Sequence, residues 1–135
     1  MIEESYVSFD TAKLLKEAGF RELTKTHYSN RGQVWETALP ADYNDDFNCN
    51  TCNRPTQALA ARWLREVNGI HVSSNIFMDS ANDADGKTVD EWTFWSYDLF
   101  DNSGRIIEES DDRYDSYEEA LEAGLQEAIK LIKKQ

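Results

Sequence analysis

Apolar residues recur at helical spacing in three parts of the chain: near its start, in its middle and at its end. The first stripe consists of Phe9, Ala12, Leu15 and Ala18. Ser8 precedes this stripe as a suitable N-cap residue, and Gly19 follows it as a suitable stop. The pattern therefore predicts a first helix between these two residues.

The second and third stripes predict two more helices. The second consists of Leu59, Ala60, Trp63, Leu64 and Val67. It follows Pro55, which suits a first helical position because the N–H of that position has no helical partner. The third consists of Tyr117, Leu121, Leu125, Ala128 and Ile132. Ser116 and Glu119 form a capping box at its start.

The apolar positions alternate with polar ones from Ile70 onward, and this is the period of a β-strand. A long strand is predicted from Val89 to Phe100, after a polar turn over residues 79–87. It places Trp92 and Phe94 on one face. Its other face holds Trp95, Tyr97 and Leu99. A third strand over residues 105–109 follows the turn of residues 101–104.

Between the first two helices, residues 26–39 predict a short hairpin around Asn30-Arg31-Gly32, and residues 40–53 are expected to form a loop. Strands joined by turns this short must be antiparallel. The predicted class is therefore α+β, with an antiparallel three-stranded meander packed against three helices. The N-terminal hairpin would extend that meander or stand beside it. With six Gly and two Pro in 135 residues, no linker is evident, so residues 1–135 are expected to be a single domain.

The formal net charge is −12, and it is unevenly distributed. Residues 79–119 contain fourteen acids and three bases, so they account for −11 of it. Such a segment should repel nucleic acid and anionic membranes, so direct binding to either is not expected. The first residues lack the features of a secretory signal, and no apolar run approaches the roughly 18 residues of a membrane helix. With only two cysteines, a soluble cytoplasmic protein is expected.

Two stretches carry a family resemblance: VSFDTAKLLKEAGF at residues 7–20 and PTQALAARWLREVNGIHV at residues 55–72. They resemble short uncharacterised proteins from gut Bacteroides-type bacteria and their phages. Members of that family are similar to this chain in two features. They have a central helix with the motif P-T-Q-x5-W-L-R-E, and they have an acidic C-terminal half that ends in an E-E-A helix. The resemblance implies an origin in a phage or mobile element, and it implies no catalytic activity.

Cys49 and Cys52 have the C-x2-C spacing with which two thiolates hold one metal ion. A structural zinc needs four ligands, so His27 and His71 would have to complete the set from distant positions. A redox role calls for a strand before the pair and a helix after it, whereas a polar loop precedes this pair. Two loop cysteines without a metal are the favoured interpretation, and a metal-stabilised or redox domain is the alternative.

Large aromatic side chains occupy both faces of the predicted strand from Val89 to Phe100. One interpretation is that the protein's own helices cover both faces. The other is that Trp92, Trp95 and Tyr97 line a surface for a protein partner or for a second copy in a homodimer, because exposed aromatic clusters often mark interfaces.

The run from Glu108 to Glu119 contains seven acids and one base. Most such runs are solvated loops. The alternative is that its carboxylates imitate a nucleic-acid backbone and inhibit a basic host protein.

Motifs of common enzyme classes are missing: the chain has no G-x-S-x-G, no H-E-x-x-H and no Gly-rich phosphate loop. Neither enzymatic activity nor a cofactor is therefore expected. The sequence favours a small non-enzymatic binding protein of bacterial or phage origin whose partner is a protein. The acidic inhibitor and the metal-stabilised domain are the two alternatives.

Overall fold

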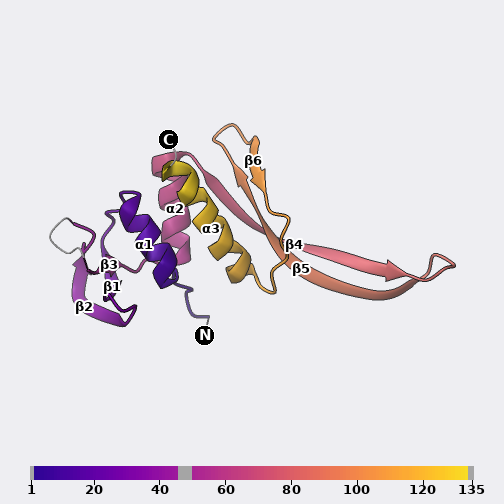
Figure 1. Cartoon of the computed structure of the whole chain (residues 1–135), viewed down its shortest axis with the longest axis horizontal. Helices are drawn as coiled ribbons and strands as arrows, with labels where there is room; N and C mark the ends of the chain where they lie inside the picture. Colours follow the sequence, from indigo (N-terminus) through magenta and orange to yellow (C-terminus); the bar gives the residue numbers. More distant parts are fainter. Residues whose placement is uncertain (1, 46–49, 134–135) are drawn as a thin grey trace.

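A computed structural model describes residues 2–45 and 50–133, and the side chain of residue 133 is not described. It confirms the α+β class (Figure 1). The elements are, in chain order, α1 (Phe9–Glu17), β1 (Thr24–Tyr28), β2 (Val34–Ala41), β3 (Cys52–Asn53), α2 (Gln57–Asn68), β4 (His71–Asn82), β5 (Thr88–Phe100), β6 (Ile106–Glu109) and α3 (Tyr117–Lys133). In the described ranges, no helix is long and apolar enough to cross a membrane.

Short polar side chains fix the helix starts, largely where the sequence indicated. The Ser8 hydroxyl accepts the Thr11 N–H at 3.2 Å at the start of α1. The prediction for Pro55 was wrong. Thr56 is the N-cap of α2, because its hydroxyl accepts the Leu59 N–H at 3.1 Å, and Pro55 therefore lies outside the helix.

The N-terminal hairpin forms a sheet of its own with strand order β2-β1-β3 and does not extend the meander. The expectation of a loop over residues 40–53 was wrong at both ends. β2 continues to Ala41, and Cys52–Asn53 pairs with His27 and Tyr28 of β1. A two-residue strand has no period to recognise in the sequence. It forms because the second edge of β1 offers it backbone partners.

The meander is a second antiparallel sheet with order β4-β5-β6. Directly opposite residues share a face, so the register defines two faces. The helix face, covered by α3 in the body of the protein, includes Val72, Ser74, Ile76, Met78, Trp95, Tyr97 and Leu99. The open face is the opposite one, and it includes Phe77, Asp79, Trp92, Phe94, Ser96 and Asp98.

One core joins the helices to this sheet. Its fully buried side chains come from distant segments and include Phe20, Leu64, Leu99 and Leu125. Helix α3 lies so close to the sheet that a Cβ on Gly124 would come within 2.7 Å of Val72 Cγ1. This close contact fixes the orientation of the sheet relative to the helices.

The distal half of the β4–β5 hairpin projects away from the three helices as a two-stranded arm (Figure 1). We define the arm as residues 76–95, from the Ile76–Trp95 pair to the turn at its tip. In that turn, the Asp83 carboxylate accepts the N–H groups of Asp85 and Lys87 at 2.9 Å each. The arm is thus a hydrogen-bonded two-stranded ribbon that lies beyond the helices.

Candidate interaction surface

The three aromatic residues singled out in the sequence lie in three different environments. Trp92 is 42% exposed on the open face of the arm. Trp95 is half-buried on the helix face, with its ring perpendicular to that of Tyr117 at 5.6 Å. Tyr97 is only 5% exposed, and burial raises its pKa to about 12. The expectation that Tyr97 lines a surface was wrong, because α3 packs over this part of the strand.

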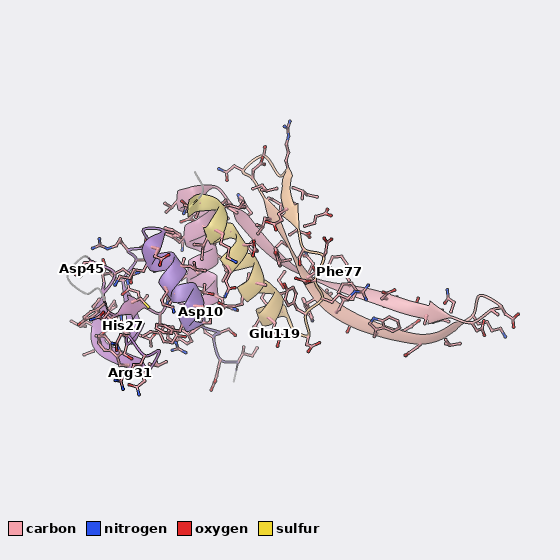
Figure 2. All side chains as sticks on the ribbon, in the orientation of Figure 1. Asp10, His27, Arg31, Asp45, Phe77 and Glu119 are labelled. Carbon is pink, nitrogen blue, oxygen red and sulfur yellow. The ribbon has the colours of Figure 1, made fainter. Side chains whose placement is uncertain are left out.

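The arm exposes further apolar side chains in addition to Trp92. Ile76, Phe77 and Met78 are 56%, 43% and 67% exposed, and Val89 near the tip is 63% exposed. In Figure 2, Phe77 lies at the base of the arm. Three consecutive large apolar residues place hydrophobic surface on both faces of a strand, and this break in the alternation was the available signal.

A concavity of about 430 Å³ lies on the open face, where the arm meets the body. Its floor contains the stacked rings of Phe77 and Phe94, with centroids 5.5 Å apart. The full lining is Phe77, Phe94, Ser96, Asp98, Glu109, Ser110, Asp111, Asp112 and Arg113. Four carboxylates and one guanidinium thus surround an aromatic floor.

Arg113 of the same chain lies on this surface. Its guanidinium lies 4.2 Å from the centroid of the Phe94 ring and 2.9 Å from an Asp79 carboxylate oxygen. The hydrogen bond from Arg113 holds the pKa of Asp79 below its ordinary value. An aromatic face combined with a carboxylate is favourable for a planar cation.

The acidic segment after β6 is held along the edge of this concavity. The Ser96 hydroxyl, which is buried, donates to the carbonyl of Asp112 at 3.1 Å. Tyr114 then exchanges two backbone hydrogen bonds of 2.8 Å with Trp95. Asp111, Asp112 and Glu109 remain exposed. The backbone of this segment is therefore hydrogen-bonded to β5, while its carboxylates face solvent.

The structure gives no support to a metal or redox site at Cys52. This thiol is 3% exposed, and burial raises its pKa, which disfavours the thiolate that metals and disulfides require. Cys49 lies outside the described residues. His27 is buried between Trp35 and Tyr43, and the His71 ring lies 2.9 Å from Asn102. No cluster of three or more potential metal ligands occurs in the part of the chain that the structure describes.

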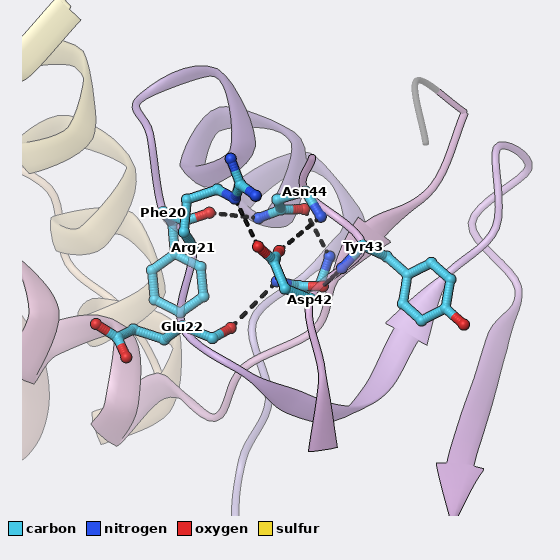
Figure 3. A network of polar contacts seen from close by, with 7 residues as sticks. Phe20, Arg21, Glu22, Asp42, Tyr43 and Asn44 are labelled. Carbon is cyan, nitrogen blue, oxygen red and sulfur yellow. Dashed lines mark hydrogen bonds and ion pairs between the residues drawn. The ribbon is translucent and has the colours of Figure 1, made fainter. Parts of the chain in front are cut away.

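A polar network beside the small sheet has a structural role (Figure 3). The buried Asn53 side chain donates to the Glu22 carbonyl and to Asp42 at 3.1 and 2.9 Å, and it accepts the Tyr43 N–H at 2.7 Å. Asn44 donates to the Phe20 carbonyl at 2.8 Å. Because these groups satisfy one another, the network fixes the turn after β2 rather than leaving groups for a ligand.

Comparison of the chain with known protein-family models, with curated proteins and with solved structures found no match in any of the three.

Proposed function

We propose that the chain is a non-enzymatic protein-binding module that holds a basic partner protein on the open face of its β4–β5–β6 sheet. The observation that supports this most directly is the position of Arg113, whose guanidinium is bound by Phe94 and Asp79 at the rim of an acidic concavity. Arginine or lysine side chains of a partner would find the same chemistry beside it.

Charge and apolar surface together support a protein partner. The concavity contains Asp98, Glu109, Asp111 and Asp112 against Arg113 alone, a net charge of −3. The exposed Trp92 ring adds apolar area on the same face. Aromatic anchors with a charged rim are typical of protein interfaces, and the negative potential would accelerate association with a basic protein. The cytoplasmic location and the phage or mobile-element origin belong to this proposal and rest on composition and on the sequence resemblance.

Site-specific photo-crosslinking tests the proposal. A photoreactive amino acid would replace Trp92 in one variant and Tyr6 in a control variant, because these side chains have similar exposure (42% and 39%). In the cells that produce the chain, position 92 should yield adducts with basic proteins, and added salt should weaken them. Equal adduct patterns at positions 92 and 6 would contradict the proposal.

A second candidate function is inhibition of a nucleic-acid-binding protein by mimicry, and the exposed carboxylates of Glu109, Asp111, Asp112 and Asp115 favour it. It makes a separate prediction. The protein captured at position 92 should itself bind duplex DNA or RNA, and excess nucleic acid should displace it from this chain. If the captured partner has no affinity for nucleic acid, mimicry is ruled out, whereas binding of a basic partner protein remains supported.

A further inference from the structure

The outer edge of β4 is free of any strand partner in the described residues, because β4 pairs only with β5. The register shows which backbone groups point outward. Trp95 exchanges its backbone hydrogen bonds with Tyr114, so these groups of Trp95 point away from β4. Ile76 lies opposite Trp95, and its N–H and C=O must likewise point away from β5. By alternation, Ser74 and Met78 also direct these groups to the free edge.

This edge lacks the features that normally keep two strand edges apart. Exposed edges are usually protected by charged side chains, prolines or bulges. Residues 72–80 contain no proline, no glycine and one charged residue, Asp79, whose carboxylate is paired with Arg113 of the same chain, and the irregularity in β4 lies further out, between Ala81 and Asn82. The β5 side of the arm carries Asp90 and Glu91 instead. Only one edge of the arm is therefore suited to pairing with another strand.

The sequence of this edge is chemically symmetric about Phe77. It reads Ser74-Asn75-Ile76-Phe77-Met78-Asp79-Ser80. If two such strands pair antiparallel about Phe77, serine faces serine, Asn75 faces Asp79, Ile76 faces Met78, and Phe77 faces its own copy. Each pair matches in polarity, and Asn75 and Asp79 can hydrogen-bond. A strand that is complementary to itself fits a two-fold interface, in which the same patch contributes from both sides.

We propose that two copies of the chain associate through the free edges of β4, antiparallel and with the two-fold axis at Phe77. The two sheets then form one six-stranded sheet, in which each Ile76–Met78 pair exchanges two backbone hydrogen bonds. On the helix face, Ile76 and Met78 of both copies cover one another; they are 56% and 67% exposed in the single chain. On the open face, the two Phe77 rings meet beside their Phe94 partners.

The charge distribution is compatible with this arrangement. Each chain carries −12, but Asp79 is the only acid between residues 72 and 82, and it is paired with Arg113 of its own chain. The carboxylates of the concavity lie on β5, on β6 and after β6, on the side of the sheet away from the β4 edge. The proposal does not depend on the partner proposed above, because purified chain alone tests it.

Sedimentation of the purified chain over a range of concentrations measures the dissociation constant of the dimer. Two proline variants, one on each edge of the arm, are compared with the wild type. In Ile76→Pro, the lost N–H is one that points out of the β4–β5 ladder, so the single chain keeps its internal hydrogen bonds while the edge is blocked. In the control Thr93→Pro, the lost N–H also points outward, but on the β5 edge, because Thr93 lies opposite Met78. We expect a wild-type dimer, a dissociation constant raised about tenfold or more by Ile76→Pro, and no such change for Thr93→Pro.

A charge swap tests which residues face each other across the proposed interface. It does not depend on whether the fold tolerates a proline in β4 or β5. One variant carries Ile76→Lys and Met78→Lys, and the other carries Ile76→Glu and Met78→Glu. Each alone should be monomeric, because like charges would face each other across the axis. A mixture of the two should form a heterodimer, since every lysine then faces a glutamate. A wild-type chain that is monomeric at all concentrations, or a mixture that stays monomeric, would overturn the proposal. Equal effects of the two proline variants would also overturn it.

Discussion

His27 is the one histidine of the described residues that is fully buried, and its environment shows how a single side chain can tie stability to pH. Its ring packs against Trp35 and Tyr43, with centroids 4.7 Å away in both cases. Burial favours the neutral ring and lowers the pKa of His27, although Asn53 and Asp42 act in the opposite direction. The sequence pattern pointed to this residue only as a distant metal ligand. Its burial depends on the strand pairing of β1 with both β2 and β3.

We predict that the free energy of unfolding falls as the pH is lowered from 7 to 5. In the unfolded chain, His27 titrates near the ordinary histidine pKa of 6.5, so below that pH the unfolded state binds more protons than the folded state. The stability associated with neutral His27 is therefore present above pH 6.5 and declines below it. Urea unfolding at a series of pH values measures this effect, and a His27→Gln variant should show a smaller slope.

Asp42 affects stability in a different pH range from His27 and therefore serves as a comparison. Burial alone would raise the pKa of this carboxyl, but hydrogen bonds from Arg21, Asn44 and Asn53 outweigh burial and lower it. Its contribution to stability is thus lost only below about pH 4, where an ordinary aspartate becomes protonated. If the slope between pH 7 and 5 is unchanged in His27→Gln, the assignment to His27 is wrong.

At the level of elements, Glu122 of α3 joins the three helices through a shared set of hydrogen bonds. Its carboxylate accepts the Ser8 N–H and hydroxyl at 3.2 Å each and the Thr11 hydroxyl, all from the start of α1. It also accepts the Gln57 side-chain amide of α2 at 3.0 Å. Thr11 and Gln57 are buried, so these donors depend on protein partners.

We predict that Glu122→Ala lowers the free energy of unfolding by about 2 kcal/mol, the typical loss when buried donors lose a charged acceptor. The matched control is Glu118→Ala, one helical turn earlier in α3, whose side chain is exposed and should change stability by less than about 0.5 kcal/mol. Chemical denaturation of the two variants under identical conditions gives the comparison. Equal losses would show that Glu122 does not join the helices.

Elements with strong local patterns could be predicted from the sequence. The capping residues Ser8 and Ser116 and the stop at Gly19 mark helix boundaries that the structure confirms within one or two residues. β3 could not be predicted, because two residues carry no period and pair only where β1 leaves an edge. The consecutive residues Ile76, Phe77 and Met78 indicate apolar side chains on both faces of the strand. They do not show where a covering helix ends, so the exposure of Ile76 and Met78 could not be predicted.

At the scale of the whole molecule, the excess of carboxylates lies on the β4–β5–β6 sheet and on the segment that follows it. Residues 79–119 hold −11 of the net charge of −12. The helices α1 and α2 and the small sheet belong to a segment that is nearly neutral, since residues 1–78 contain ten acids and eight bases. Mutual repulsion among the carboxylates should therefore destabilise one side of the folded molecule.

We predict that raising the salt concentration from about 0.02 M to about 0.2 M increases the melting temperature, because the screening length shortens to less than the spacing of many of these charges. The double variant Asp111→Asn and Asp112→Asn should show a smaller increase than the wild type. The control is Glu3→Gln with Glu4→Gln, which removes the same charge outside the acidic segment. If both double variants reduce the salt effect equally, the increase in melting temperature depends on the net charge of the protein and not on the location of the charges.

The sequence by itself determined the class of the fold, the three helices, the N-terminal hairpin, the meander and the location of the charge, because each follows from local periodicity, capping chemistry or composition. Only the tertiary structure decided which apolar residues are exposed. Tyr97 and Met78 both lie on the helix face of the same sheet, yet one is buried and the other is 67% exposed. The difference arises because α3 packs against the body of the sheet and the arm extends past it, and the position of one element over another depends on contacts between distant segments.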